Sequence, residues 1–180
     1  MKKEKIKVKE IEIPNGVNIE INKDEIKVNG PKGEIKKRFG IKLEKKENKL
    51  IFEVKGNKRD KKRKGTIIAH IKNMICGVVN GFEYKLQICP VHFPIKVSIS
   101  PDKKNIIIEN FLGETKKRKA DILSNVNIEI KGDIITVNSI DKEAAGQTAA
   151  NIEMATKIRN KDRRIFQDGI FMIEKAGKKI

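Results

Sequence analysis

The chain has 180 residues, with 41 Lys and Arg against 24 Asp and Glu, and a net charge of +17. No apolar run approaches the roughly 20 residues that cross a bilayer, and the polar start lacks a signal-peptide core, so a membrane protein is not expected. Two cysteines, Cys76 and Cys89, are too few for a disulfide scaffold and favour a reducing, cytoplasmic location.

The positive charge is concentrated in the first half of the chain. Residues 1–90 carry 24 basic and 12 acidic side chains, whereas residues 91–180 carry 17 and 12. An excess of this size favours a polyanionic partner such as RNA or DNA. Runs of lysine are also common on solvated loops, so each run has two interpretations, an RNA-facing segment or a solvated surface.

The first half predicts strands followed by one helix. Residues 17–21 and 26–28 alternate apolar and polar side chains around a turn at residues 22–25, which predicts a β-hairpin. After a turn at residues 29–33, strands are predicted over 34–39 and 50–54. A basic loop follows and ends at Gly65-Thr66. Its cationic residues are Lys58, Arg59, Lys61, Lys62, Arg63 and Lys64.

A helix is predicted to begin with Thr66 as its N-cap and to end at Asn80-Gly81. Its apolar residues recur at spacings of three and four, which is typical of a helix packed on a sheet. The predicted buried stripe is Ile67, Ile68, Ile71, Met74, Ile75, Val78 and Val79.

The second half repeats this plan. Strands are predicted over 95–100, 106–109, 127–130 and 134–137. A helix over about 141–158 should turn Ala145, Ala149 and Ile152 inward, with Ala155 or Thr156 next on that face. A basic segment at 160–164 precedes a last strand over 169–173, which the repeat aligns with residues 82–88.

Two sequence echoes indicate a tandem duplication. The hexapeptide Gly33–Arg38 returns as Gly113–Arg118, a shift of 80, and residues 65–71 align with 146–152, a shift of 81. A repeat of this period indicates two domains rather than a solenoid. We therefore expect an α+β fold of two small domains, each with antiparallel sheets and one packed helix, over residues 1–82 and 83–180, with a boundary between about 82 and 92.

Catalytic and metal chemistry is not expected. The soft metal ligands are His70, Cys76, Cys89 and His92, and their spacing does not give the two tight ligand pairs of a closed zinc site. No serine or histidine lies in a nucleophile motif, and Gly30–Gly33 is not followed by the residues of a phosphate loop. We expect no metal, no cofactor and no enzymatic activity.

Composition narrows the style of nucleic-acid binding. Aromatic residues make up 4% of the chain and Trp is absent, whereas proteins that read single strands need exposed rings for base stacking. Lysine is abundant and suits phosphate contacts, which position a protein without reading sequence. We expect a protein that docks on a folded RNA and recognises its shape.

Three segments resemble a known family. Residues His92–Ile95, Asn110–Glu114 and Asn160–Ile170 are similar to the archaeal and eukaryotic branch of the ribosomal protein L-six family of the large subunit, as is the helix run His70–Phe82. The resemblance covers nearly the whole chain. It implies a non-catalytic protein that acts as a monomer within the ribosome, bound to large-subunit rRNA near the sarcin–ricin loop, with other ribosomal proteins and translation factors nearby.

The resemblance also implies where the rRNA contact lies. The C-terminal domain makes the main contact, at the helix start and at the basic segment that follows the helix. The bacterial branch has a Lys-Gly-Lys-Gly run where Gln167-Asp168-Gly169 stands, so bacterial contacts there do not carry over. The implied contact residues are Gly146, Gln147, Lys157, Arg159, Lys161, Arg163, Arg164, Gln167 and Gly169, with Asp168 in the same stretch.

The charge distribution and the resemblance indicate different domains as the main rRNA contact. Charge favours the run at residues 58–64 in the first domain, and the resemblance favours the second. Both segments are therefore candidate rRNA contacts. The alternatives are a non-specific architectural DNA-binding protein, which charge alone would permit, and an RNA-modifying enzyme, for which no catalytic constellation is found.

Overall fold

The computed structural model describes residues 7–22, 25–39, 44–46, 49–54, 57–162 and 164–180. The chain forms two compact units, residues 1–81 and residues 82–180. Each unit contains antiparallel sheets and one long helix, so the predicted α+β class is confirmed. Within the described part of the chain, no helix is both long and apolar enough to span a membrane.

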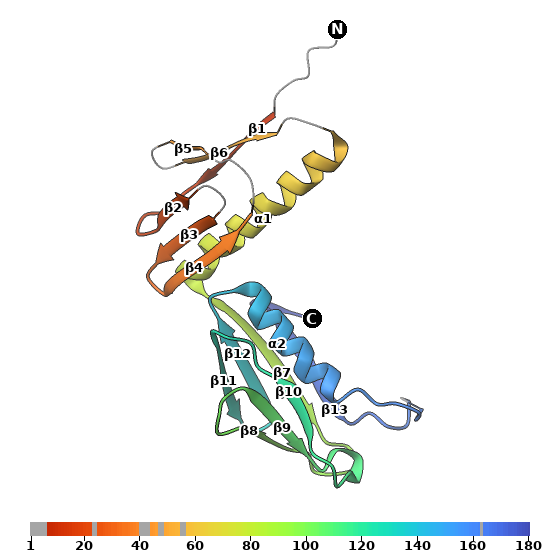
Figure 1. Cartoon of the computed structure of the whole chain (residues 1–180). Helices are drawn as coiled ribbons and strands as arrows, with labels where there is room; N and C mark the ends of the chain where they lie inside the picture. Colours follow the sequence, from red (N-terminus) through yellow and green to blue (C-terminus); the bar gives the residue numbers. More distant parts are fainter. Residues whose placement is uncertain (1–6, 23–24, 40–43, 47–48, 55–56, 163) are drawn as a thin grey trace. The chain divides into compact units, whose positions relative to one another are not determined.

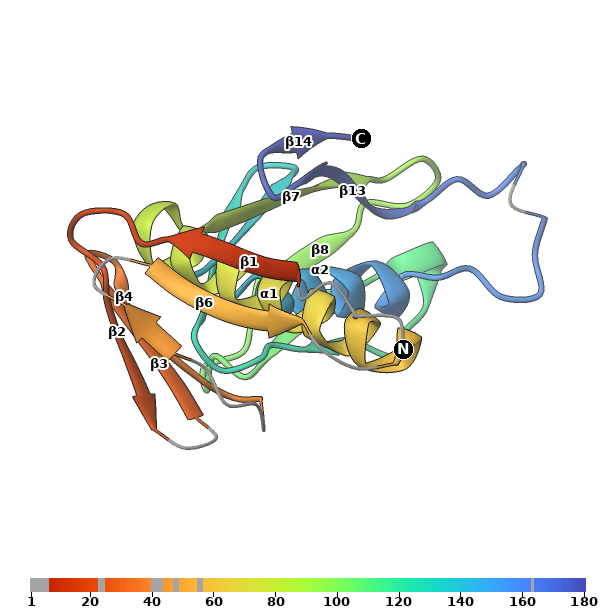
Figure 2. The same ribbon diagram turned by 90° about the horizontal axis from the view of Figure 1, so that it is seen from above.

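The first unit combines two three-stranded sheets with one helix (Figure 1). Its sheets have the strand orders β2-β3-β4 and β1-β6-β5, and α1 packs against β3, β4 and β6 (Figure 2). Its elements are β1 (Lys7–Glu12), β2 (Asn18–Asn22), β3 (Glu25–Gly30), β4 (Gly33–Arg38), β5 (Glu44–Lys46), β6 (Lys49–Val54) and α1 (Lys58–Asn80).

The predicted hairpin is confirmed in β2 and β3. Ile19 lies opposite Val28 and Ile21 opposite Ile26, and Ile19, Ile26 and Val28 are buried while Glu20 faces solvent. Two residues of the predicted turn, 23 and 24, lie outside the described residues. The strands predicted over 34–39 and 50–54 correspond to β4 and β6.

The predicted basic loop is wrong, because residues 58–64 form the first two turns of α1. Asn57 precedes the helix, and its backbone N–H donates to the Asp60 carboxylate at 3.2 Å, a reciprocal cap that satisfies an N-terminal donor. Thr66 is therefore not an N-cap. Its hydroxyl lies inside the helix and donates to the Lys62 carbonyl at 3.2 Å. The predicted C-terminal stop is confirmed at Gly81, where φ is 73°.

The second unit combines a three-stranded sheet, β8-β9-β10, with a five-stranded sheet, β11-β12-β7-β13-β14. Its elements are β7 (Phe82–Cys89), β8 (Lys96–Ile99), β9 (Asn105–Glu109), the short 3-10 helix η1 (Phe111–Gly113), β10 (Arg118–Asp121), β11 (Val126–Lys131), β12 (Ile134–Ser139), α2 (Lys142–Ala155), β13 (Gly169–Lys175) and β14 (Lys178–Lys179).

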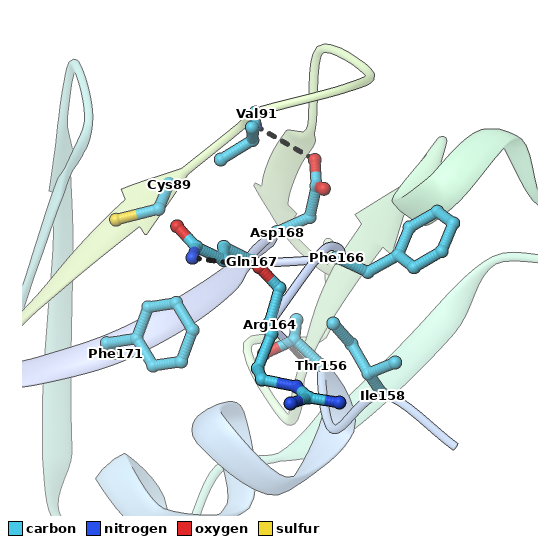
Figure 3. A pocket seen from close by; sticks show the side chains of 9 residues that line it. All are labelled: Cys89, Val91, Thr156, Ile158, Arg164, Phe166, Gln167, Asp168 and Phe171. Carbon is cyan, nitrogen blue, oxygen red and sulfur yellow. Dashed lines mark hydrogen bonds between the residues drawn. The ribbon is translucent and has the colours of Figure 1, made fainter. Parts of the chain in front are cut away.

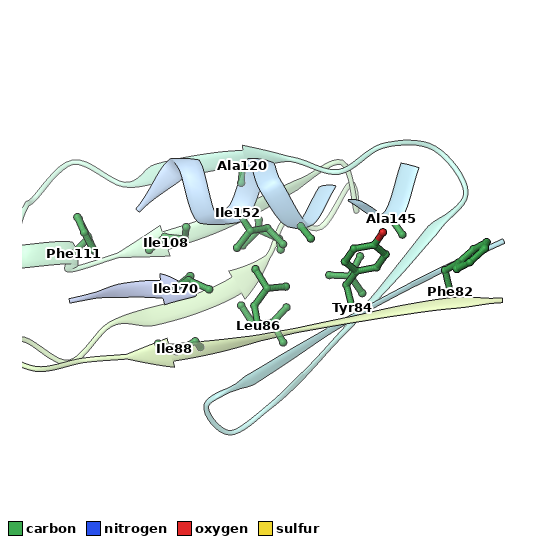
Figure 4. Packing of buried hydrophobic residues seen from close by; sticks show 14 residues of the cluster. Phe82, Tyr84, Leu86, Ile88, Ile108, Phe111, Ala120, Ala145, Ile152 and Ile170 are labelled. Atoms are coloured by element: carbon green, nitrogen blue, oxygen red, sulfur yellow. The ribbon is translucent and has the colours of Figure 1, made fainter. Parts of the chain in front are cut away.

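The core of the second unit lies between α2 and the sheets (Figure 4). Small residues of α2, including Ala145 and Ala149, let the helix approach β7, where Tyr84 and Leu86 are buried. Ile152 is also buried, as the sequence predicted, and Thr156 rather than Ala155 completes the buried face. Asp141 caps the helix by accepting the Glu143 N–H at 3.0 Å.

The strand β7 takes the place in the second unit that β1 takes in the first. Lys7 lies opposite Val54 and Phe82 lies opposite Ser139, so each strand pairs with the strand that precedes the helix of its unit. The predicted equivalence of residues 82–88 with the last strand is therefore wrong. Instead, β7 and β13 lie side by side in one sheet, with Ile88 opposite Ile170.

The two copies of the repeated hexapeptide have different structures. Gly33–Arg38 forms all of β4. In the second copy, Gly113 ends η1 and only Arg118 belongs to a strand, β10, which was not predicted. The hexapeptide is a sign of the duplication, but its two copies form different secondary structures.

A close approach of β3 to α1 requires glycine at position 30. A Cβ at Gly30 would lie 2.7 Å from Val78 Cγ2, and Lys32 N–H donates to the Val78 carbonyl at 3.0 Å beside it. We expect Gly30→Ala to lower the free energy of unfolding by about 1–3 kcal/mol through overpacking. Thermal or urea unfolding of the whole chain measures this change.

Gly65→Ala is the matched control for this prediction. Gly65 lies inside α1, and a Cβ there would meet nothing within 4 Å. Because alanine is the better helix former, this change should raise the free energy of unfolding by about 0.5–1 kcal/mol. If both variants shifted stability in the same direction, the close approach at Gly30 would not be the cause.

Candidate RNA interface

A loop over residues 157–168 connects α2 to β13 in the second unit. It projects from that unit in both views, in blue (Figures 1 and 2). Thr156 closes its base, because this buried hydroxyl accepts the Ile170 N–H at 3.0 Å and donates to the Glu153 carbonyl at 3.1 Å. The two ends of the loop are therefore joined through one side chain.

Arg118 holds the start of the loop. Its Nη1 donates to the Ala155 carbonyl at 2.9 Å and to the Lys157 carbonyl at 3.3 Å, and so satisfies acceptors at the C-terminus of α2. The guanidinium also makes a bidentate pair with Glu114, at 2.8 and 2.6 Å, and lies 4.3 Å from the centre of the Phe111 ring. The hydrogen bond from Arg118 lowers the pKa of the Glu114 carboxyl. The second hexapeptide thus positions the loop.

Asp168 holds the end of the loop. Its buried carboxylate accepts the Val91 N–H at 2.9 Å and the His92 N–H at 2.8 Å, and its other oxygen lies 2.6 Å from His92 Nδ1. Burial opposes the charge, but the hydrogen bonds from His92, Val91 and Phe93 outweigh it and lower the pKa of Asp168 to about 2. Asp168, which the resemblance places in the contact zone, is thus a buried residue that anchors the end of the loop.

The loop gathers the cations that the resemblance indicated. Lys157, Arg159, Lys161 and Arg164 are exposed, and Arg163 lies outside the described residues. Lys161 Nζ lies 4.5 Å from the centre of the Phe166 ring. The exposed Gln167 side chain donates to the Arg164 carbonyl at 3.3 Å. Apart from residue 163, the predicted basic segment is therefore a surface of exposed charge.

Arg164 is held by its neighbour Asp162. Its Nε and Nη2 lie 3.2 and 2.9 Å from the two carboxylate oxygens, and its backbone N–H donates to the same group. This pairing lowers the pKa of Asp162. Nη1 takes no part in it, so the guanidinium still presents donors to an anion.

Three further residues that the resemblance implied as contacts, two glycines and a glutamine, lie on α2 and β13. Gly146 lies in the second turn of α2, not at its start, and a Cβ there would be 3.2 Å from the Tyr84 hydroxyl. Gly169 is buried beneath the Phe171 ring. Gln147 is exposed and donates to Asn151 at 2.9 Å. Both glycines allow close packing, so they shape the surface rather than present side chains.

A pocket of about 700 Å³ opens beside the end of the loop (Figure 3). Arg164 and Gln167, both expected in the contact zone, lie on its lining together with apolar side chains. The other lining residues are Cys89, Val91, Thr156, Ile158, Phe166, Asp168 and Phe171. This pocket was not predicted, because β7, the end of α2 and the start of β13 come together only in the folded chain.

The second cationic cluster lies at the N-terminus of α1 in the first unit. Lys58, Arg59, Lys61, Lys62 and Arg63 are exposed, and Lys64 is half-buried. Positive charges at this end of a helix oppose its dipole and cost stability. The cluster is therefore not explained by the stability of the helix.

The chain is similar to known proteins over most of its length. The family model described as ribosomal protein L6 matches residues 13–81 and again residues 93–169. The large ribosomal subunit protein uL6 of Methanothrix thermoacetophila is 46% identical over 172 residues, which is 93% of this chain and 97% of that protein. The chain belongs to the ribosomal protein L6 family. The two matched segments also confirm the tandem duplication.

Other uL6 proteins are similar to this chain over nearly the same length. The protein of Staphylothermus marinus is 47% identical over 171 residues, covering 92% of each chain. That of Methanobrevibacter smithii is 45% identical over 170 residues, covering 92% of this chain and 94% of its own. Membership of the L6 family, a structural and non-enzymatic family, confirms that the chain is a ribosomal protein and not an enzyme.

The Asp168 anchor predicts an acid-dependent loss of stability. A carboxyl whose pKa falls from an ordinary 3.8 to about 2 on folding stabilises the fold above pH 4, by about 2 kcal/mol, and this contribution disappears between pH 4 and pH 2. We expect Asp168→Asn to lower the free energy of unfolding at pH 7 by about 2 kcal/mol and to flatten its pH dependence in that window. Urea unfolding at several pH values measures both effects.

The control for this prediction is Asp102→Asn, which changes an exposed carboxylate in a turn of the same unit. It should leave the free energy of unfolding at pH 7 unchanged. If Asp168→Asn kept the wild-type slope between pH 4 and pH 2, another group would be responsible for the acid sensitivity.

Proposed function

We propose that this protein binds large-subunit rRNA and stabilises its fold, with the second unit making the principal contact through residues 157–168. The observation that carries the proposal is a cationic loop anchored at both ends. Thr156, Arg118 and Asp168 fix its backbone, while Lys157, Arg159, Lys161 and Arg164 face solvent. A surface fixed in this way presents its charges in a set geometry, as recognition of RNA shape requires.

The relatives support this assignment. Each of the three relatives is named as a protein of the large ribosomal subunit, and this chain spans almost their whole length. The chain is accordingly a structural constituent of that subunit. Proteins of this family are cytoplasmic in archaea.

The finer placement rests on the family resemblance. The chain would lie on the factor-binding side of the subunit, close to the sarcin–ricin loop, as a monomer with other ribosomal proteins beside it. Translation factors would dock nearby. Its contact residues would be the exposed loop cations with Arg163, Gln167 and Gln147, while Gly146 and Gly169 hold the backbone that carries them.

We also propose that the cationic start of α1 is a second rRNA contact. Five exposed cations lie within two helical turns at the end of the helix where positive charge is least favourable. Phosphates would reverse this penalty, because both the side chains and the helix N-terminus attract anions.

Loss of loop cations should change the salt dependence of binding. The double variant Arg159→Ala/Arg164→Ala should bind large-subunit rRNA more weakly, and the slope of log affinity against log salt should become shallower by about 0.7–0.9 for each lost phosphate contact. Filter binding at several salt concentrations measures the slope. Lys131→Ala/Lys179→Ala, which removes two exposed charges elsewhere in the unit, is the charge-matched control.

An equal loss of slope in both double variants would mean that overall charge, and not the loop, drives binding. Competition with duplex DNA tests the architectural DNA-binding alternative in the same assay. DNA that displaced rRNA at equal concentration would contradict the ribosomal site.

Removal of cations from α1 should have opposite effects on stability and affinity. The triple variant Lys58→Ala/Arg59→Ala/Lys62→Ala relieves repulsion with the helix dipole, so the free energy of unfolding should rise by about 1 kcal/mol. Its affinity for rRNA should fall. Lys72→Ala, an exposed change in the middle of α1, is the control. Unchanged affinity in the triple variant would remove this cluster from the contact surface.

A further inference from the structure

The aromatic ring of Phe171 is partly exposed and packs against the backbone at a glycine. The residue is 38% exposed although it lies in the middle of β13. A Cβ at Gly169 would lie 2.8 Å from Cζ and 3.0 Å from Cε2 of the ring, so the ring rests directly on the glycine. We call Phe171 with Gly169 the aromatic platform. Glycine at position 169 is what lets the ring lie this close to the strand.

Phe171 of the platform forms part of the wall of the 700 Å³ pocket (Figure 3). Cys89, Val91 and Ile158 add apolar surface to the pocket. Arg164 and Gln167 supply the exposed polar groups of its lining. The combination is an apolar slot with a cation and an amide beside it.

Aromatic residues are few in this chain, and Phe171 exposes its ring to solvent. The chain has seven Phe and no Trp; Phe82 and Phe111 are buried in the core, whereas Phe93 and Phe171 are 44% and 38% exposed. Exposure of an aromatic ring beside other apolar side chains leaves hydrophobic surface in water, and such surface marks interaction sites. The ring is therefore available to a partner.

The charges around the platform identify the kind of partner. An apolar side chain from a protein would fill the slot but would leave the Arg164 guanidinium and the other loop cations without acceptors. A nucleotide matches both parts, because its base is a flat apolar face with polar edges and its phosphate is an anion. RNA-binding proteins take unpaired bases by stacking them on aromatic rings.

We propose that the aromatic platform binds a single unpaired nucleobase of RNA, stacked on the Phe171 ring. Arg164 Nη1 would donate to the phosphate of that nucleotide. The Gln167 amide would pair with the edge of the base, exchanging its long 3.3 Å bond to the Arg164 carbonyl for a bond to the ligand. This inference rests on the proposed rRNA binding and adds one base-specific element to a surface otherwise suited to shape.

A tryptophan reporter tests the stacking directly. Because the chain contains no Trp, Phe171→Trp creates a single fluorophore at the platform. Addition of purified large-subunit rRNA should quench its emission in proportion to binding measured on the same samples. Ile99→Trp, at a 36% exposed position in β8 outside the pocket, is the matched control and should keep its emission.

Affinity measurements provide a second, independent test. Phe171→Leu keeps an apolar side chain but removes the ring, so it should lower rRNA affinity by about 5- to 100-fold, the usual effect of losing one stacked base. The salt slope should stay at the wild-type value, because stacking releases no counterions. Gly169→Ala, which displaces the ring, should lower affinity in the same way.

The outcomes separate this inference from the proposed function. Unquenched Phe171→Trp emission, or wild-type affinity of Phe171→Leu, in a protein that still binds rRNA would overturn the base platform and leave rRNA binding standing. Quenching or a spectral shift that occurs only with another ribosomal protein would also overturn it, by assigning the slot to a protein side chain. Absence of any rRNA binding would overturn both proposals.

Discussion

The geometry of the candidate interface depends on one buried carboxylate. Asp168 joins the end of the basic loop to the turn after β7, which is 76 residues away in the chain at His92. A buried charge without donors is very costly, so this turn and the start of β13 cannot separate without bringing Asp168 into water. Thr156 and Arg118 hold the other end of the loop through hydrogen bonds to the backbone. The exposed cations thus belong to a segment that the core holds in place.

The regular elements could be predicted because their side chains repeat with a clear period. The alternation of β2 and β3 was predicted correctly, and so was the buried stripe of α1 except for Val79, which is half-buried. The start of α1 was missed because its first two turns are polar on every side and carry no period, and the Asn57 and Asp60 cap was overlooked. β10 was missed for a related reason, since only Ala120 among its four residues is buried.

The candidate site could be predicted only in part. Residue type and resemblance identified the loop cations, because charge is visible in the sequence. The partners that fix the loop were not visible, since Arg118 and Asp168 act on residues far from them in the chain. Gly146 and Gly169 were read as contact residues, whereas their surroundings show Tyr84 and Phe171 packed against them. The sequence shows which side chains are able to bind RNA. Tertiary contacts decide which residues hold those side chains at the surface.

The position of β7 has a consequence for how the protein is made. Because β7 belongs to the second unit and only Gly81 separates it from α1, each unit is one uninterrupted stretch of chain. Domains fold as units during synthesis, at about 5–20 residues per second, so the second unit takes roughly 5–20 s to follow the first from the exit tunnel. Among the residues that the structure describes, the sheets of the first unit contain no strand from the second. Synthesis can therefore deliver the duplicated halves one after the other. All strands of the first unit precede α1, whereas the second unit also needs β13 and β14, which follow α2.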